Sequence, residues 1–168
     1  MLCESPTAAA IAINITRHVE SVPFGRKLRE AEQAKFAKYP HINSLNFHSR
    51  GMRMLSNVDD VVDRKCINIA AQIEGLDEKL VESVGELAKM LKSENYGLDK
   101  KVTAEAVAIK YGYALEIIEH ALVVLEVSDK DTKVIDFYDQ MRRPLMMKKS
   151  ATFKPDTVVL LDECQDYT

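Results

Sequence analysis

A short apolar run near the C-terminus constrains the fold more than any other feature of the sequence. The run extends from Thr157 to Leu161, reads T-V-V-L-L, and follows Lys154-Pro155-Asp156. Successive side chains of a strand point to opposite faces, so a run without polar alternation predicts a strand that is apolar on both faces. Such strands occupy the centre of parallel sheets covered by helices. We therefore expect an α/β fold with a buried strand over 157–161.

Two carboxylates, Asp162 and Glu163, directly follow this predicted strand. In open α/β sheets, ligands bind beyond the carboxyl ends of the strands. One carboxylate at that position can hold Mg²⁺, a cation that prefers oxygen ligands and bridges nucleotide phosphates. The next can orient or deprotonate an attacking water. The alternative is that Asp162 only caps the strand end and Glu163 is solvated.

Hydrophobic periodicity predicts the elements of the first 56 residues. A helix is expected over 5–20, because Ser5 can cap it and Pro6 is tolerated at its first position. Ile11, Ile15, Val19 and Val22 recur at helical spacing, and Pro23 is expected to end the helix at about Ser21. A second helix is expected over 26–38, and strands are expected near 22–25 and 42–47.

Residues 57–133 carry almost exclusively helical signals and predict a helical insertion. One apolar stripe covers 76–91 and stops at Asn95-Tyr96-Gly97. A second, longer stripe covers 107–125 and is opened by Thr103.

Composition excludes several classes of protein. The formal net charge is −3, which does not favour a protein that simply coats DNA, although 26–38 and 142–154 are locally basic. The three cysteines are far apart and form no CxxC pair, which argues against a disulfide framework or a zinc site. We see neither a signal peptide nor an apolar run of the roughly 20 residues that a membrane span needs. A cytoplasmic protein is expected.

The segment from Val158 to Asp166, V-V-L-L-D-E-C-Q-D, resembles motif II of UvrD/Rep-type superfamily 1 DNA helicases. In that family an apolar strand runs into the sequence DExQD. Cys164 stands where the family usually has alanine. Gln165 and Asp166 distinguish this motif from those of the DEAD and DExH helicases.

Three further segments resemble landmarks of the same family in the same order. Residues 46–51, N-F-H-S-R-G, resemble motif Ib, T-F-H-S-x-G, with Asn46 in place of threonine. Residues 22–27, V-P-F-G-R-K, resemble motif Ia, close to A-F-N-K, with Gly25 in place of asparagine. Residues 135–145 resemble the I-D-F-x-D-M…P-L segment that precedes motif II, and a short helix from Asp136 is expected to end or kink before Pro144.

The resemblance implies a partial RecA-like P-loop NTPase domain. Residues 1–56 and 134–168 would form the motor domain, and 57–133 would correspond to the helical subdomain 1B. The implied activity is ATP-driven translocation on single-stranded DNA and unwinding of duplex DNA, as in replication and repair, with ATP and Mg²⁺ as cofactors. The implied roles of the motif II residues are Mg²⁺-ATP binding by Asp162, activation of water by Glu163, and sensing of the γ-phosphate by Gln165.

The resemblance also implies a DNA-binding surface. Phe24 would stack on a base, an interaction that tolerates any sequence. The residues expected beside it near the DNA backbone are Arg26, Lys27, His48, Ser49 and Arg50. The alternatives are that Phe24 is a core aromatic and that His48 is an ordinary surface or core histidine.

No GxxxxGK[ST] loop occurs in the sequence, although phosphate binding in this family depends on one. We expect a fragment of a helicase rather than a degenerate relative, lacking this loop and the second RecA-like domain and inactive by itself. The alternative is a non-enzymatic module that binds single-stranded DNA or a protein partner. The resemblance is compatible with a nucleoid-associated or viral protein, or a nuclear one in a eukaryote. Glu116 and His120 are spaced for a metal, but no third ligand is evident.

Overall fold

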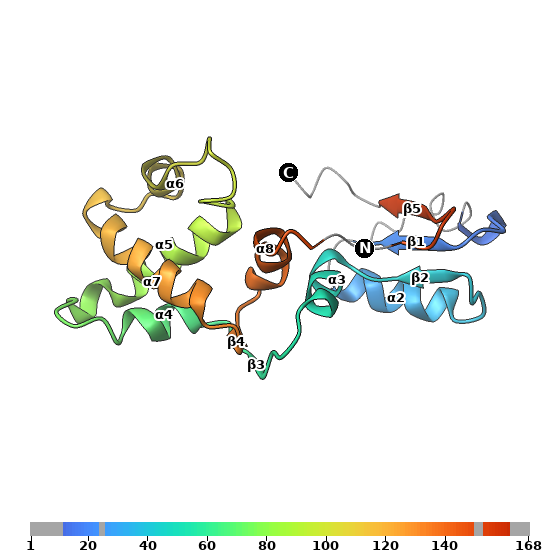
Figure 1. The fold of residues 1–168 in the computed structure, drawn as a ribbon, viewed down its shortest axis with the longest axis horizontal. Coiled ribbons are helices and arrows are strands. Elements are labelled where there is room, and N and C mark those ends of the chain that lie inside the picture. Colours follow the sequence, from blue (N-terminus) through green and yellow to red (C-terminus); the bar gives the residue numbers. More distant parts are fainter. Residues whose placement is uncertain (1–11, 24–25, 150–152, 162–168) are drawn as a thin grey trace. The chain divides into compact units, whose positions relative to one another are not determined.

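The computed structural model of the chain describes residues 12–23, 26–149 and 153–161. The chain divides into two compact units, residues 1–50 with 151–168 and residues 51–150 (Figure 1). The predicted helical insertion, 57–133, lies inside the second unit.

The first unit contains a three-stranded sheet. Its strands are β1 (Val19–Val22), β2 (Ile42–Ser44) and β5 (Val158–Leu161), in the order β2-β1-β5. Both pairings are parallel, and Val19 is opposite Ile42 on one side and Val158 on the other. The predicted α/β class with a parallel sheet is confirmed at this level.

The prediction of a helix over 5–20 is wrong at its C-terminal end. Residues 12–14 are helical, residues 5–11 lie outside the described part of the chain, and Val19 begins strand β1. All four residues of β1 are buried, and its backbone pairs with a strand on each side. Pairing and burial in the middle of the sheet therefore outweigh the helical spacing of the apolar residues.

Strand β5 forms where it was predicted and is parallel, but it is not buried on both faces. Its burial alternates, with Val159 and Leu161 exposed. Among the described residues β5 has one partner, β1, so it lies at an edge of this sheet and β1 is the central strand. A run of apolar residues without alternation does not by itself distinguish these two positions.

One further helix lies in the described part of this unit, and the helix that follows β2 crosses from this unit into the second one, to which Gly51 belongs. Helix α2 (Arg26–Phe36) follows the predicted 26–38 and buries Leu28, Glu32 and Phe36, which are spaced by four residues. Helix α3 (Phe47–Met54) begins at Phe47. Strand β2 is therefore shorter than the strand predicted over 42–47. The side-chain Oδ1 of Asn46 accepts a hydrogen bond from the backbone N–H of Ser49 at 3.0 Å, which caps this helix.

The second unit is mainly helical. Besides α8, described below, its helices include α4 (Lys65–Ala70), α5 (Val81–Ser93), α6 (Ala104–Tyr111) and α7 (Ile118–Lys130), with one-turn helices η1 (Glu78–Leu80) and η2 (Leu115–Ile117). Their apolar faces meet in one core, whose fully buried members include Val84, Leu87, Leu91, Ala121 and Val124.

The apolar stripe predicted over 107–125 is divided between α6 and α7. Gly112 ends α6 in the left-handed conformation, with φ 74°. This conformation favours glycine and commonly ends a helix. The predicted start is confirmed, since Thr103 Oγ1 accepts a hydrogen bond from the N–H of Ala106 at 3.2 Å.

A short parallel pairing, not expected from the sequence, joins the two ends of the helical block. Strand β3 (Asp60–Val61) pairs with β4 (Val134–Ile135). Two-residue strands carry too few side chains for a periodic signal.

Helix α8 (Asp139–Met146) begins at Asp139 rather than at Asp136 and continues past Pro144, so of the two expected outcomes, an end or a kink before Pro144, the end does not occur. Proline lacks the N–H that would bond to the carbonyl of Gln140. The backbone of Gly51 covers that carbonyl, because a Cβ on Gly51 would lie 1.7 Å from the Gln140 oxygen. The released carbonyl therefore lies against the backbone of Gly51 on α3. None of the described helices has the length and apolar character required to cross a membrane.

Candidate functional site

The three predicted nucleotide- and DNA-binding segments follow strands of the same sheet. In the parallel sheet, Val22 is opposite Leu161, and Ser21 is opposite Ser44. The three strands therefore end at one edge of the sheet, the edge at which ligands bind in open α/β folds. Phe24, Asp162, Glu163 and Gln165 come directly after these strands in the sequence but lie outside the described residues.

Arg26 and Lys27 begin α2 and are exposed. The side chain of Arg26 is 82% exposed, and its Nε donates a hydrogen bond to Glu30 Oε1 at 2.7 Å. This hydrogen bond raises the pKa of Arg26 further above its ordinary value. Both side chains are accessible cations beside the carboxyl end of β1.

Arg50 is engaged inside the first unit. Its guanidinium forms an ion pair with Glu20 on β1, donates to the carbonyl of Leu45 at 3.2 Å, and lies 5.6 Å above the ring of Phe153. Burial alone would raise the pKa of Glu20, but hydrogen bonds from Arg50 and His18 hold it below its ordinary value. A phosphate would have to compete with Glu20 for Arg50.

His48 and Ser49 lie on the first turn of α3, half-buried. Burial lowers the pKa of His48, which favours the neutral imidazole over a cation. The hydroxyl of Ser49 accepts a hydrogen bond from Arg29 of α2. Arg29 was not predicted from the sequence, although it is three residues after Arg26 and so on a neighbouring part of the α2 surface.

A cluster of charged side chains, the ion cluster, lies buried in the second unit. Lys92 Nζ on α5 is 2.6 Å from Asp136 Oδ2 and 2.9 Å from Asp139 Oδ1. Lys65 Nζ on α4 is 3.3 Å from Asp139 Oδ2, and Arg143 Nε on α8 is 3.5 Å from Asp139 Oδ1. The two aspartates also hold each other, since each carboxylate accepts a hydrogen bond from the other's backbone N–H. This is the physical role of the I-D-F-x-D segment, which the sequence alone did not reveal.

The ion cluster also satisfies polar groups at the end of α7. Lys92 donates to the Ser128 hydroxyl at 2.8 Å, and Lys65 donates to the Ser128 carbonyl at 2.8 Å. Cys66 contacts Asp136, and burial raises the pKa of its thiol to about 11. A thiol with such a pKa is not a nucleophile at neutral pH. Cys3 and Cys164 lie outside the described residues, so the expectation of neither a disulfide framework nor a zinc site stays a prediction.

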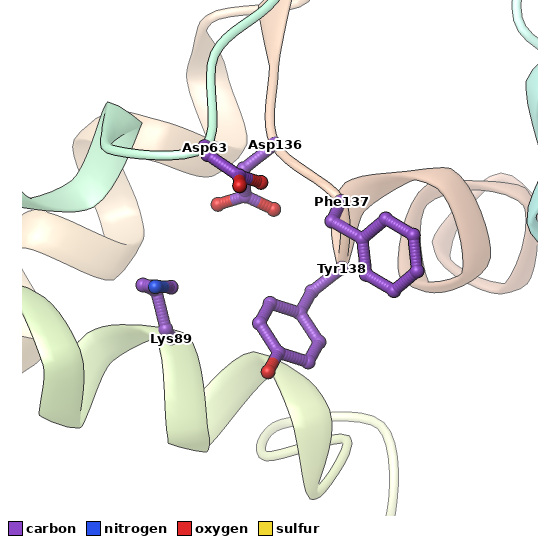
Figure 2. A pocket seen from close by; sticks show the side chains of 5 residues that line it. All are labelled: Asp63, Lys89, Asp136, Phe137 and Tyr138. Atoms are coloured by element: carbon purple, nitrogen blue, oxygen red, sulfur yellow. The ribbon is translucent and has the colours of Figure 1, made fainter.

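A pocket of about 340 Å³ opens beside the ion cluster. Figure 2 shows Asp63 and Asp136 together, Lys89 of α5 opposite them, the Tyr138 ring beside Lys89, and Phe137 pointing away from Lys89. Lys89 is paired with Glu86 at 2.9 Å. The lining combines both signs of charge with two aromatic rings, and it defines no single ligand.

Within the described ranges, no three or more His, Cys, Asp or Glu side chains are grouped so that they could hold a metal ion. Glu116 lies on η2 and His120 on α7. Of the basic stretch 142–154, Arg142 and Arg143 are buried, so its exposed cations in the described residues are Lys148, Lys149 and Lys154.

Comparisons of the chain with protein-family models, with curated proteins and with solved structures found no match. The resemblance to UvrD-type helicases remains a prediction from the sequence motifs.

Proposed function

We propose that this chain is part of an ATP-dependent DNA helicase motor, with motif II binding Mg²⁺-ATP and motifs Ia and Ib binding single-stranded DNA. One observation supports it most: the segments resembling these motifs follow three neighbouring parallel strands that end at one edge of a sheet. Hydrolysis and DNA binding must be coupled in a motor, and in this proposal the edge that the three strands share couples them.

In this proposal, Asp162 holds the magnesium ion and Glu163 activates the attacking water. Gln165 senses the γ-phosphate. The phosphate-binding loop and the second RecA-like domain would have to be supplied by sequence outside these 168 residues. The coding sequence on either side tests this half of the proposal, which predicts a G-x-x-x-x-G-K-[ST] loop in the same reading frame.

The DNA-binding half is testable with the chain itself. We expect weak, sequence-independent binding to single strands, with Phe24 stacking on a base and Arg26 and Lys27 neutralising phosphates. Phe24→Ala should weaken binding to all sequences alike, by about tenfold, since one stacked base contributes roughly 1–3 kcal/mol. Arg26→Ala should reduce the slope of log K against log salt by about 1. Fluorescence anisotropy with labelled oligothymidine and mixed-sequence strands at low salt measures both.

Lys130→Ala is a matched control for Arg26→Ala. Lys130 is 73% exposed and pairs with Glu126 four residues away, as Arg26 pairs with Glu30, but it lies on α7 in the second unit. It should leave both affinity and salt slope unchanged. If Phe24→Ala and Arg26→Ala bind as the parent does, this sheet edge is not the DNA-binding surface, and the cations of 142–154 become the next candidates.

The second candidate is a non-enzymatic module that binds single-stranded DNA, and the exposed cations of α2 favour it independently of any nucleotide site. It predicts the same anisotropy results. It differs in predicting a coding sequence without a phosphate-binding loop on either side.

A further inference from the structure

Glu20 places a nearly buried carboxylate on β1, with a side chain that is 10% exposed. Three donors from three different segments surround it. His18 Nε2 lies 2.8 Å from Oε1, Asn43 Nδ2 donates to Oε2 at 2.9 Å, and the guanidinium of Arg50 pairs with Oε2. Because the pKa of Glu20 lies below its ordinary value despite burial, the carboxylate is ionised at neutral pH. The cluster therefore holds a permanent negative charge against Arg50.

Arg50 lies just below the surface of the first unit. Its side chain is 13% exposed, and the Phe153 ring over which it lies belongs to a residue that is 44% exposed. It is the fourth residue of α3, the helix that follows β2 at the edge where the three strands end. A rotation of the long arginine side chain is sufficient to bring the guanidinium to this edge.

The ion pair draws Arg50 away from α2, the helix with the exposed cations of the proposed DNA-binding surface. Successive side chains of a strand point to opposite faces of the sheet. Ser21 donates a hydrogen bond to Glu32 of α2 at 2.8 Å, so the neighbouring Glu20 points to the other face. Ser49, the residue before Arg50, accepts a hydrogen bond from α2. Adjacent residues of α3 are therefore bound to opposite sides of the sheet.

The contact between Glu20 and Arg50 can be exchanged at moderate cost. Breaking a buried ion pair is most damaging when a charge is left without partners. Glu20 retains two donors, His18 and Asn43, when Arg50 leaves. A phosphate is a suitable new partner for Arg50, since a guanidinium can bind it through two parallel hydrogen bonds.

We propose that Glu20 competes with the nucleic-acid backbone for Arg50: it holds Arg50 in the free chain and releases it to a phosphate when a single strand binds. Glu20 then lowers the affinity for single strands, and Arg50 contacts DNA only in the complex. This inference rests on the proposed function and adds to it a residue that limits the affinity. In the alternative, the pair is purely structural and persists in the complex.

Glu20→Gln removes the competing charge and keeps the size of the side chain and one acceptor oxygen. The affinity for labelled oligothymidine at low salt should rise by about tenfold, the low end of the coupling between close charge pairs. Fluorescence anisotropy measures it. Glu126→Gln is the control, because it removes the same charge from the chain at a 67% exposed position of α7. It should change the affinity little.

Arg50→Gln shows whether the gain acts through Arg50. It should lower the affinity by a larger factor in the Glu20→Gln background than in the parent chain, because only in the parent does Arg50 first have to leave a carboxylate. Residues that act independently give equal factors in both backgrounds. Equal factors would overturn the proposal.

The pKa of Glu20 in the unsubstituted chain gives a test that does not depend on the folding of Glu20→Gln. When Arg50 leaves, Glu20 loses a cation that lowers its pKa, so this pKa should rise when oligothymidine saturates the chain. The carboxyl ¹³C signal of Glu20 in NMR spectra follows the titration. The charge of DNA also raises the pKa of a nearby carboxyl group, so the rise should exceed that in the Arg50→Gln chain.

A folded Glu20→Gln chain that binds as the parent does would overturn the proposal, as would a pKa of Glu20 that DNA leaves unchanged. Either result is distinct from failure of the proposed function, in which Phe24→Ala and Arg26→Ala also bind as the parent does. If circular dichroism shows that Glu20→Gln is unfolded, the pKa measurement decides.

Discussion

Lys92 is a charged side chain placed where the helix pattern calls for an apolar one. It lies four residues after Ala88 on the buried face of α5, and its side chain is fully buried. Burial alone would lower the pKa of Lys92, but Cys66, Asp139 and Asp136 raise it above its ordinary value. The aspartates therefore compensate the desolvation of this cation. A lysine within an apolar stripe indicates that an acidic partner exists. It does not indicate where in the sequence that partner lies.

Replacing Lys92 should be far more damaging than replacing its neighbour Lys89 on the same helix. Lys92→Met leaves Asp136 and Asp139 buried with less positive charge, which costs about 3–5 kcal/mol. Lys89→Met removes only a partly exposed pair with Glu86, which contributes about 0.5 kcal/mol or less. Urea denaturation of both variants measures the difference. Equal losses would show that the ion cluster contributes nothing beyond surface pairing.

The ion cluster also predicts acid sensitivity. Burial alone would raise the pKa of Asp139, but Lys92 and Lys65 hold it below its ordinary value. As pH falls below about 4, the unfolded state takes up this proton first, so the free energy of unfolding decreases. The contribution is fully present above that pH and is lost as pH falls through the pKa of the folded state. Asp139→Asn should lower the free energy of unfolding at neutral pH and make that free energy depend less on pH in the acid range. An unchanged pH dependence would show that other carboxylates cause it.

At the scale of elements, local signals predicted helices better than strands. Thr103 as the cap of α6, the end of α5 before Asn95, and helix α2 all depend on neighbouring residues and are confirmed. The predicted end of the first helix is wrong because β1 forms by pairing with two strands that are distant in the sequence, β2 and β5. Single-sequence periodicity contains no information about such partners.

The contact between α3 and α8 shows how two sequence landmarks depend on each other. Gly51 belongs to the segment resembling motif Ib, and Pro144 to the I-D-F-x-D-M…P-L segment. Neither has an evident chemical role in the sequence, but the glycine provides the space for the carbonyl that the proline releases. Spacing along the chain cannot reveal such a contact.

Gly51→Ala should therefore destabilise the protein despite the higher helix propensity of alanine. Alanine gains about 1 kcal/mol as a helix former, but its Cβ would overlap the Gln140 carbonyl, and such overpacking costs about 1–3 kcal/mol. Arg53→Ala, at an exposed position of the same helix, should have almost no effect. Thermal unfolding compares the two. A more stable Gly51→Ala variant would show that α3 and α8 are not in close contact.

At the scale of the whole molecule, the parallel sheet and the helical character of 57–133 were predictable from the sequence, whereas the candidate site remains a prediction from the order of the motifs. The predicted catalytic residues follow β5, whose position beside β1 the sequence did not indicate. The engagement of Arg50 with Glu20 was also unpredictable, because the two are thirty residues apart and in different elements.

The chain should not hydrolyse ATP by itself. It contains no GxxxxGK[ST] sequence, so no loop of backbone N–H groups and lysine holds the β- and γ-phosphates. Phosphate release should be undetectable with or without single-stranded DNA and Mg²⁺. Turnover that disappears in Glu163→Gln would show that another part of the chain binds the triphosphate.

The pairing of β3 with β4 has a consequence for the order in which the chain folds during synthesis. Strand β1 is made early, but its partner β5 is made more than a hundred residues later, and closing so long a loop is slow. The β3–β4 pair joins the two ends of the helical block, with Asp60 opposite Val134. Once that block has folded on the ribosome, the effective loop between β1 and β5 is much shorter. The three-stranded sheet is then completed after that block has folded, and nascent chains that stall before β5 would expose the edge of β1 that pairs with β5.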